Sequence, residues 1–299
     1  MHFVAVLNRD GGTLKSTDLD ALAQRMRKTL EDAGHSLDVH VVEGEGVLPA
    51  LEKAAASRKA DVVLAGGGDG TISAAAACLK GKKKALAVLP AGTMNLFARG
   101  LGIPLSLDTA VAAFAEGKIR KVDMASANDR PFVHQFSVGM HAKMVHLRER
   151  MEFGTRWGKI RATLRAAYMT LRNPTTMKVE LKIGATEVLA RTTGIGVSNN
   201  LFGEGHLPYA DHPDAGTLGI YVTVARQPRE LVRYFWQLAR GRWQENDQVE
   251  IHEAEKVVLT VLSPKRRRRC VIDGELLPLD RQTTVIIHPK ALNVLVPKS

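Results

Sequence analysis

The first hundred residues alternate between short apolar runs and amphipathic stretches. Apolar runs typical of buried strands occur at 2–8, 62–65 and 85–89, and Leu37, Val39 and Val41 alternate with polar residues as in a further strand. Between them, the stretches 17–34, 47–59 and 71–80 carry apolar residues at the three- and four-residue spacing of a helix. Alternating strands and helices are typical of a parallel sheet that helices cover on both faces. We therefore expect an α/β domain over residues 1–125.

Beyond residue 125 the pattern changes to strands joined by short turns. These strands are predicted at 176–183, 187–198, 218–225, 249–262, 270–273 and 283–288. Two helical stretches, 156–172 and 228–240, interrupt them. We therefore expect a second, mostly antiparallel β domain over residues 126–299.

A glycine-rich loop follows the strand at 62–65 and precedes a helix. It reads Gly66-Gly67-Gly68-Asp69-Gly70-Thr71. A strand, a glycine loop and a helix start together present backbone N–H groups to a phosphate, although a tight structural turn has the same pattern. The single carboxylate would repel a phosphate unless it acts through a metal ion or a proton. Ligands of parallel sheets bind at the carboxyl ends of the strands, where this loop and the loop after residue 89 both lie.

Composition narrows the choice of partners and compartment. The 299 residues carry a formal net charge of +11, which favours anionic partners, whereas the 5% aromatic content is thin for stacking on single-stranded bases. Two cysteines, Cys78 and Cys270, suit a reducing compartment. There is no run of about 18 apolar residues that could span a bilayer. We expect a cytoplasmic protein.

Four motifs occur in a characteristic order. Asn8-Arg9-Asp10-Gly11-Gly12 follows the first strand, the glycine loop follows the third, a Pro90–Arg99 stretch containing Gly92-Thr93-Met94-Asn95 follows the fourth, and Asp273-Gly274-Glu275 comes late. Together they resemble the diacylglycerol kinase catalytic family, which includes soluble bacterial lipid kinases, sphingosine kinases and ceramide kinases. The resemblance implies an N-terminal α/β domain similar to NAD kinases and phosphofructokinases, then a C-terminal β-sandwich. It also implies that ATP and a lipid hydroxyl meet in the cleft between the domains.

The resemblance assigns roles to individual residues. Glu275 is implied as the proton acceptor, with Asp273 as its close rival and Asp69 as a further catalytic acid. Mg²⁺ would be held through Asp69, Asp123 and Asp214. The implied ATP-binding residues are Asn8, Gly11, Gly12, Gly66, Gly67, Gly68, Asp69, Gly70, Thr71, Gly92, Thr93 and Asn95.

The chain departs from the family pattern in three places. Many relatives carry an acid after the asparagine of the third motif, where this chain has Leu96. Relatives often carry two adjacent acids before a glycine in a metal-binding loop, where this chain reads Asp214-Ala215-Gly216. A threonine that relatives carry beyond the second strand is replaced near Val42-Glu43. The first two departures bear on a structural metal site.

The leading hypothesis is an ATP-dependent kinase of a lipid such as diacylglycerol. One alternative is a kinase of a soluble alcohol, as NAD kinases are, and a second is a non-catalytic nucleic-acid-binding protein. On the leading hypothesis nucleic acid is not a partner, and the cations make reversible peripheral contact with an anionic membrane. The sequence specifies neither the lipid nor the oligomeric state. The cations expected at the membrane are Lys265, Arg266, Arg267, Arg268 and Arg269, helped by Arg156, Lys159, Arg161 and Arg165.

Overall fold

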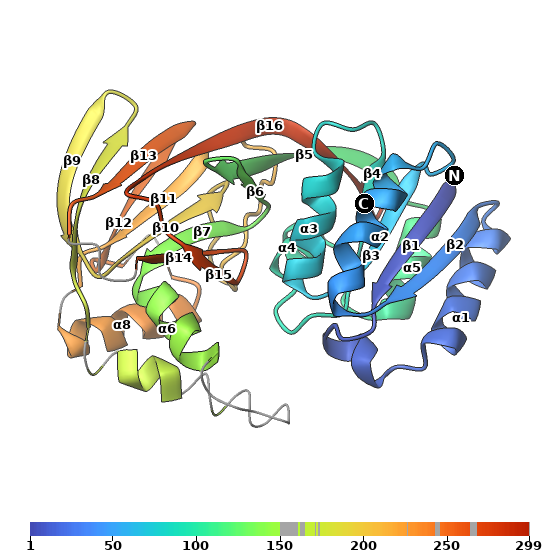
Figure 1. Ribbon diagram of the computed structural model, residues 1–299, viewed down its shortest axis with the longest axis horizontal. Helices are drawn as coiled ribbons and strands as arrows, with labels where there is room; N and C mark the ends of the chain where they lie inside the picture. Colours follow the sequence, from blue (N-terminus) through green and yellow to red (C-terminus); the bar gives the residue numbers. More distant parts are fainter. Residues whose placement is uncertain are drawn as a thin grey trace. The chain divides into compact units, whose positions relative to one another are not determined.

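The chain divides into two compact units in the computed structural model (Figure 1). The structure describes residues 1–149, 161, 165–170, 172, 174–225, 227–242, 246–263 and 268–298. The first unit comprises Met1–Met124, Asp211–Ala215 and His288–Ser299, and the second comprises Ala125–Ala210 and Gly216–Ile287. Both units are therefore discontinuous in sequence. Domain limits of 1–125 and 126–299 stay a prediction.

A parallel sheet forms the centre of the first unit. Its strands are β1 (His2–Asn8), β2 (Ser36–Val42), β3 (Val62–Gly67) and β4 (Ala85–Pro90), in the order β2-β1-β3-β4. The C-terminal part of β16 (Gln282–Val296) pairs in parallel with β4, through Asn293 and Val294. Every residue of β3 and β4 is buried. Burial on both faces explains why these strands read as continuous apolar runs.

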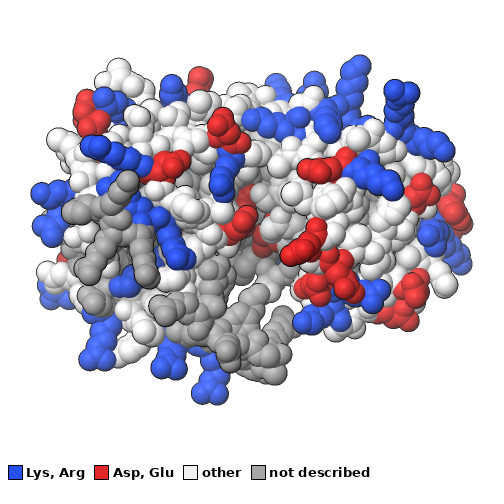
Figure 2. All heavy atoms as spheres, in the orientation of Figure 1, with Lys and Arg blue, Asp and Glu red and all other residues white. Residues whose placement is uncertain are grey.

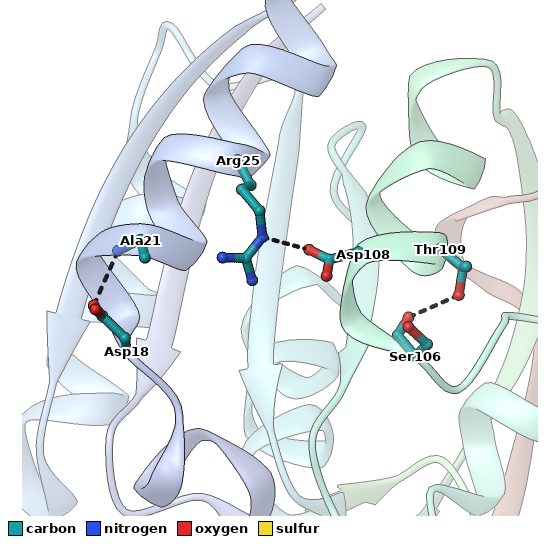
Figure 3. A network of polar contacts seen from close by, with 6 residues as sticks. All are labelled: Asp18, Ala21, Arg25, Ser106, Asp108 and Thr109. Atoms are coloured by element: carbon teal, nitrogen blue, oxygen red, sulfur yellow. Dashed lines mark hydrogen bonds and ion pairs between the residues drawn. The ribbon is translucent and has the colours of Figure 1, made fainter.

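Helices pack against this sheet in neighbouring pairs. Helix α1 (Leu19–Asp32) contacts α5 (Leu107–Ala115), and α2 (Val47–Ala56) contacts α3 (Asp69–Leu79). Asp18 caps α1 by accepting the Ala21 N–H bond at 3.0 Å, and Arg25 of α1 pairs with Asp108 of α5 at 3.0 Å (Figure 3). A short helix, α4 (Leu96–Gly100), follows β4, and 3₁₀ turns occupy Gly12–Ser16 and Gly44–Gly46.

Antiparallel strands form two layers in the second unit. One sheet has the order β12-β11-β10-β7-β14-β15. In the other layer, β9, β8, β13 and the N-terminal part of β16 pair in succession, while β5 pairs with β6. A single buried cluster contains residues of both layers, including Phe136 of β7, Val197 of β10, Leu181 of β8 and Leu259 of β13. A core shared by two sheets defines a β-sandwich.

The remaining elements of the second unit complete the description. Helices α6 (Met140–Glu149) and α8 (Pro228–Ala239) accompany the sandwich. Strand β5 (Lys118–Ala127) begins in the first unit and enters the second at Ala125. The other strands of the second unit are β6 (Arg130–Phe132), β7 (Gln135–Gly139), β8 (Met177–Ile183), β9 (Thr186–Thr192), β10 (Gly194–Asn199), β11 (Leu218–Thr223), β12 (Val249–Ala254), β13 (Lys256–Val261), β14 (Arg269–Ile272) and β15 (Glu275–Pro278).

Two strands predicted as continuous are divided in the structure. The 187–198 stretch becomes β9 and β10, which pair with different sheets. Between them, the Thr193 hydroxyl donates to the Ala225 carbonyl at 2.9 Å, and the Thr193 carbonyl accepts from Met140 at 2.8 Å. The 249–262 stretch likewise becomes β12 and β13, separated at Glu255. At each division the chain passes from one sheet of the sandwich to the other.

Candidate phosphate-binding site and acidic motif

Three loops of the first unit meet at one edge of the parallel sheet. They follow β1, β3 and β4, which are neighbours and end on the same side. Backbone hydrogen bonds tie them together: Ala91 donates to the Gly67 carbonyl at 3.1 Å, and Thr13 donates to the Ala91 carbonyl at 2.8 Å. The three N-terminal motifs found in the sequence are thus brought together in space.

Glycine is required where the backbones of these loops touch. Gly12 has a φ of +47°, and a β-carbon there would lie 1.9 Å from the Ala91 carbonyl oxygen. A β-carbon on Gly92 would lie 2.9 Å from the Gly68 Cα atom. Larger side chains at either position would force the loops apart. Glycine at these positions therefore permits the close packing of the loops.

The N-terminus of α3 opens into this group of loops. Its N-cap residue is Gly68, which offers no side chain to accept the N–H groups of the first turn. Gly68 and Asp69 are half-buried, Gly70 is exposed, and a β-carbon on Gly70 would meet nothing within 4 Å. First-turn N–H groups and the helix dipole together favour an anion. The geometry suits a phosphate.

Side chains of the first and second loops brace the start of α3. The Asn8 amide donates to the Thr71 hydroxyl at 3.2 Å, and its carbonyl oxygen accepts from the Asp10 N–H group at 3.1 Å. Thr71 is 8% exposed. The hydrogen bond between Asn8, the last residue of β1, and Thr71 therefore fixes the loop that follows β3.

Asp69 and Asn95 join α3 to the loop after β4. One Asp69 carboxylate oxygen accepts the Leu96 N–H bond at 3.2 Å. Asn95 lies in the left-handed region with a φ of 50° and exchanges two hydrogen bonds with Gly92, at 2.8 and 3.0 Å. Asn95 therefore shapes its own turn, while Thr93 is exposed on it.

The remaining acids assigned to metal binding have partners of their own. Asp123 is fully buried in β5, and its carboxylate accepts the Lys290 N–H bond at 2.7 Å. The Asp214 carboxylate pairs with Arg120 at 2.6 Å. Within the part of the chain that the structure describes, no three His, Cys, Asp or Glu side chains form a group that could hold a metal ion. Asp69, Asp123 and Asp214 are therefore not gathered into one cluster.

The late acidic motif lies in the second unit, on the turn between β14 and β15. Asp273 is 7% exposed and has a φ of 45°. Its carboxylate accepts backbone N–H bonds from Val133, His134 and Gln135, at 2.9, 3.0 and 2.9 Å. Glu275, the first residue of β15, is exposed. The two acids of the motif thus have different surroundings.

Asn199, to which the sequence assigned no role, contacts residues 133–135, the segment that the Asp273 carboxylate binds. Its backbone N–H donates to the His134 carbonyl at 2.9 Å, and its side-chain amide donates to the Val133 carbonyl at 3.1 Å. Residues 133–135 are therefore fixed by Asp273 through their N–H groups and by Asn199 through their carbonyls. A paired Asn199-Asn200 directly after a strand was the available signal.

Several residues weighed from the sequence lie outside the described part of the chain. They are Arg156, Lys159, Lys265, Arg266 and Arg267. Among the described residues, no helix combines the length and apolar character needed to cross a bilayer.

Comparison with known proteins places this chain in a family. Residues 2–127 match the family described as diacylglycerol kinase catalytic domain, and residues 135–296 match the YegS C-terminal NAD kinase beta sandwich-like domain. A relative from Cronobacter sakazakii, named "Probable lipid kinase YegS-like", is 36% identical over 129 residues, which are 42% of this chain and 43% of that protein. An uncharacterized protein of Synechocystis is 27% identical over 79% of this chain and 54% of its own length.

A solved structure shows the same fold. The crystal structure of a diacylglycerol kinase from Bacillus anthracis covers 99% of this chain and 96% of its own, with a TM-score of 0.72 and 17% identity. The matches to the two curated relatives span about half of those proteins or less. The two matched domains, in this order along the chain, show that it belongs to the family of proteins that join a diacylglycerol kinase catalytic domain to a YegS-type C-terminal domain.

Proposed function

We propose that the chain transfers the γ-phosphoryl group of ATP to the hydroxyl of a lipid such as diacylglycerol. The observation that carries this proposal is the convergence of three glycine loops on the open N-terminus of α3. Phosphoryl transfer depends mainly on alignment and charge stabilisation, which such a cradle of N–H groups supplies. Membership of a lipid kinase family supports a lipid as the acceptor.

In this proposal the N-terminal motifs bind the nucleotide. The backbone of residues 66–71 contacts the phosphates, because glycine leaves its N–H groups accessible there. Asn8, Thr71 and Asn95 act by holding the loops in place, as their contacts within the loops indicate. Gly11, Gly12, Gly92 and Thr93 complete the nucleotide site.

Asp69 is the proposed metal-organising acid, with the buried Asp123 in support. Carboxylate oxygens are the donors that Mg²⁺ prefers, and Asp69 lies in the first turn of α3, within the cradle. When bound, Mg²⁺ would neutralise charge on the phosphates. Asp214 already faces the Arg120 guanidinium, which competes with any metal ion, so we propose that this ion pair is its role.

Glu275 is the proposed proton acceptor for the attacking hydroxyl. A general base needs a carboxylate that the acceptor can reach, and Glu275 is exposed. The Asp273 carboxylate is buried and engaged by three backbone N–H groups. We therefore propose that Asp273 positions the motif and residues 133–135, and that Glu275 takes the proton as the new O–P bond forms.

The choice between a lipid and a soluble acceptor is open to direct test. The C-terminal match is described as NAD kinase-like in its β-sandwich, so a soluble dinucleotide is the second candidate acceptor. The chain would be incubated with ATP, Mg²⁺ and a total lipid extract, and in parallel with NAD, and the products identified by mass spectrometry. New phosphomonoester lipids with unmodified NAD are expected. Phosphorylated NAD without lipid products would replace the proposal with the second candidate.

We also propose a cytoplasmic enzyme in reversible contact with the membrane. A lipid with two acyl chains stays in the bilayer, so the enzyme has to reach it there. Each basic residue near an anionic surface contributes about 1 kcal/mol. Arg268 and Arg269 are the described members of the late basic run. Nucleic-acid binding through the same run remains the alternative use of these cations.

A further inference from the structure

We propose that the outward face of α8 is the membrane-docking surface of the second unit, and that Trp236 and Val232 enter the interface of an anionic bilayer. The inference rests on the proposed function, since only a lipid acceptor requires the chain to meet a bilayer. It differs from docking by the late basic run, because it adds apolar insertion and involves another part of the chain.

The two faces of α8 have opposite surroundings. Leu231 is fully buried and packs with Met140 and Ala225, and Tyr234 packs in the adjoining cluster of Phe202 and Tyr221. By contrast, Val232 is 54% exposed and Trp236 is 59% exposed. These two residues are four positions apart, so they lie on one side of the helix, away from Leu231. Large apolar side chains on an outward helix face are typical of an interaction surface.

Arginines flank this apolar pair along one side of the helix. Arg229, Arg233 and Arg240 are exposed, and at 100° per residue they share the outward face of the helix with Trp236. The Arg240 guanidinium lies over the Trp236 ring, 4.3 Å from its centre. Figure 2 shows basic side chains projecting from the edge of the second unit where Figure 1 draws α8. The surface is therefore apolar over Val232 and Trp236 and cationic along the side next to Trp236.

Two described acidic groups, one in α8 and one near it, are engaged locally. Glu230 is the one acid in α8, and its carboxylate accepts the Gln227 N–H bond at the start of the helix, at 2.9 Å. Asp247 pairs with Arg233 at 3.5 Å. The charge of the face thus stays cationic, and the chain as a whole carries +11. An anionic surface with an apolar interior complements it in both respects.

A bilayer matches these features better than a protein partner does. Interfacial helices combine arginines on the polar side with tryptophan and aliphatic residues that enter the headgroup region. Tryptophan favours that region because its ring is apolar and its N–H group is polar. The same combination recurs on the described residues of 165–172, where Tyr168 is 61% and Met169 is 42% exposed beside the exposed Arg165 and Arg172.

The test is tryptophan fluorescence with vesicles, in the absence of ATP. A Trp157→Phe/Trp243→Phe variant of the full chain keeps Trp236 as its single tryptophan. Vesicles of phosphatidylcholine and phosphatidylglycerol should shift its emission to the blue, and brominated lipid should quench it. Phosphatidylcholine alone should have little effect. Protein that sediments with the anionic vesicles while Trp236 emission stays unchanged would overturn the proposal, as would failure to sediment.

Substitutions on the native background provide the controls. Val232→Ser/Trp236→Ser should weaken vesicle sedimentation by roughly tenfold, because apolar area is lost from the contact. Leu48→Ser is the matched control, since Leu48 is 49% exposed on α2 and has Glu45 and Glu52 near it in sequence. It should sediment normally. Equal weakening by both substitutions would contradict a specific role for α8.

A kinase assay separates this inference from the proposed function. On a short-chain, soluble acceptor the Val232→Ser/Trp236→Ser variant should match the native chain, while on vesicle-borne lipid its rate should fall. Vesicle binding with no kinase activity on any lipid would leave the docking surface intact and refute the proposed function. Kinase activity on vesicle lipid that is unaffected by the α8 substitutions would refute the docking surface.

Discussion

The acidic side chains carry the most specific chemical assignments in this chain. The sequence placed Asp69, Asp273 and Glu275 in motifs and favoured Glu275 as the proton acceptor, but it left Asp273 as a close rival. The ranking depends on long-range contacts, because the three N–H groups that hold Asp273 come from residues 133–135. The same holds for Asp214, whose partner Arg120 lies 94 positions away in the sequence. Spacing along the chain contains no such information.

Asp69→Asn should reduce kcat by roughly 100-fold or more while the fold is retained. The change preserves shape but removes the charge that organises the metal ion at the transferring phosphate. Steady-state kinetics with the lipid acceptor, together with thermal unfolding, measures both effects. The exposed Asp32→Asn on α1 is the matched control and should behave as the native chain. Near-normal turnover of Asp69→Asn would remove Asp69 from the mechanism.

Glu275→Gln and Asp273→Asn should fail in different ways. Glu275→Gln should lower kcat by about 10² to 10⁴ and leave the free energy of unfolding unchanged, because an exposed base is lost. Asp273→Asn should lower the free energy of unfolding by about 2 kcal/mol, because an amide cannot accept all three backbone N–H bonds. Denaturant unfolding and kinetics on both variants distinguish the roles. A stable but inactive Asp273→Asn protein would make Asp273 the base.

Cys270 should be unreactive in the folded chain. Burial is the main cause that raises its thiol pKa, to about 11. At pH 8 only about one thiol in a thousand would then be ionised, and labelling by a disulfide reagent depends on the thiolate. We expect Cys270 to react only after unfolding. Burial also raises the thiol pKa of Cys78, but this side chain is only half-buried, so it should react slowly in the folded chain.

The same shift predicts the pH dependence of stability. The folded thiol keeps its proton up to higher pH than the unfolded one, so its contribution to stability is present below about pH 9 and is lost as pH rises towards 11. Denaturant unfolding at several pH values measures this loss. Rapid labelling of both thiols in native protein at pH 8 would contradict the raised thiol pKa of Cys270.

Among the elements, the loops after β1, β3 and β4 were predictable and several strands were not. The loops are local features in which glycine and the preceding apolar run carry the signal. The strand predicted at 283–288 in fact continues to Val296 as β16, whose C-terminal part pairs with β4. Between the two parts, Lys290 has a φ of 53° and donates its N–H group to Asp123. The predicted strand stopped before Pro289. Its continuation depends on pairing with β4, which is distant in sequence.

Replacing Gly92 or Gly70 by alanine should distinguish the two roles of the loops, which are close packing and phosphate binding. Gly92→Ala should destabilise the first unit, because its β-carbon would lie 2.9 Å from the Gly68 Cα atom. Gly70→Ala should instead raise stability by about 0.5–1 kcal/mol, since it favours the helix and meets nothing within 4 Å. The added methyl should nevertheless weaken ATP binding, because it occupies the space proposed for the phosphates.

Calorimetric titration with ATP and thermal unfolding measure both consequences. ATP binding by Gly70→Ala at native affinity would indicate that phosphate does not approach the N-terminus of α3.

As a whole molecule, the chain confirms the fold class expected from its sequence. The parallel α/β unit and the antiparallel sandwich both follow from hydrophobic periodicity, which is set by whether a strand is buried on one face or two. The sequence did not foresee that 211–215 and 288–299 return to the first unit, because that depends on tertiary pairing such as β16 with β4. The lipid kinase site and the docking of α8 on the membrane are both proposals for this whole molecule, and they are tested separately.

The most direct test of the central claim is the transfer of labelled γ-phosphate from ATP to diacylglycerol. The native chain and Asp69→Asn would be compared in mixed micelles with Mg²⁺, with NAD as the alternative acceptor in matched reactions. We expect label in a lipid phosphomonoester with the native chain, a loss of roughly 100-fold or more with Asp69→Asn, and no label in NAD. Absence of labelled product from diacylglycerol and from a panel of other lipid alcohols, or equal labelling by Asp69→Asn, would contradict the account.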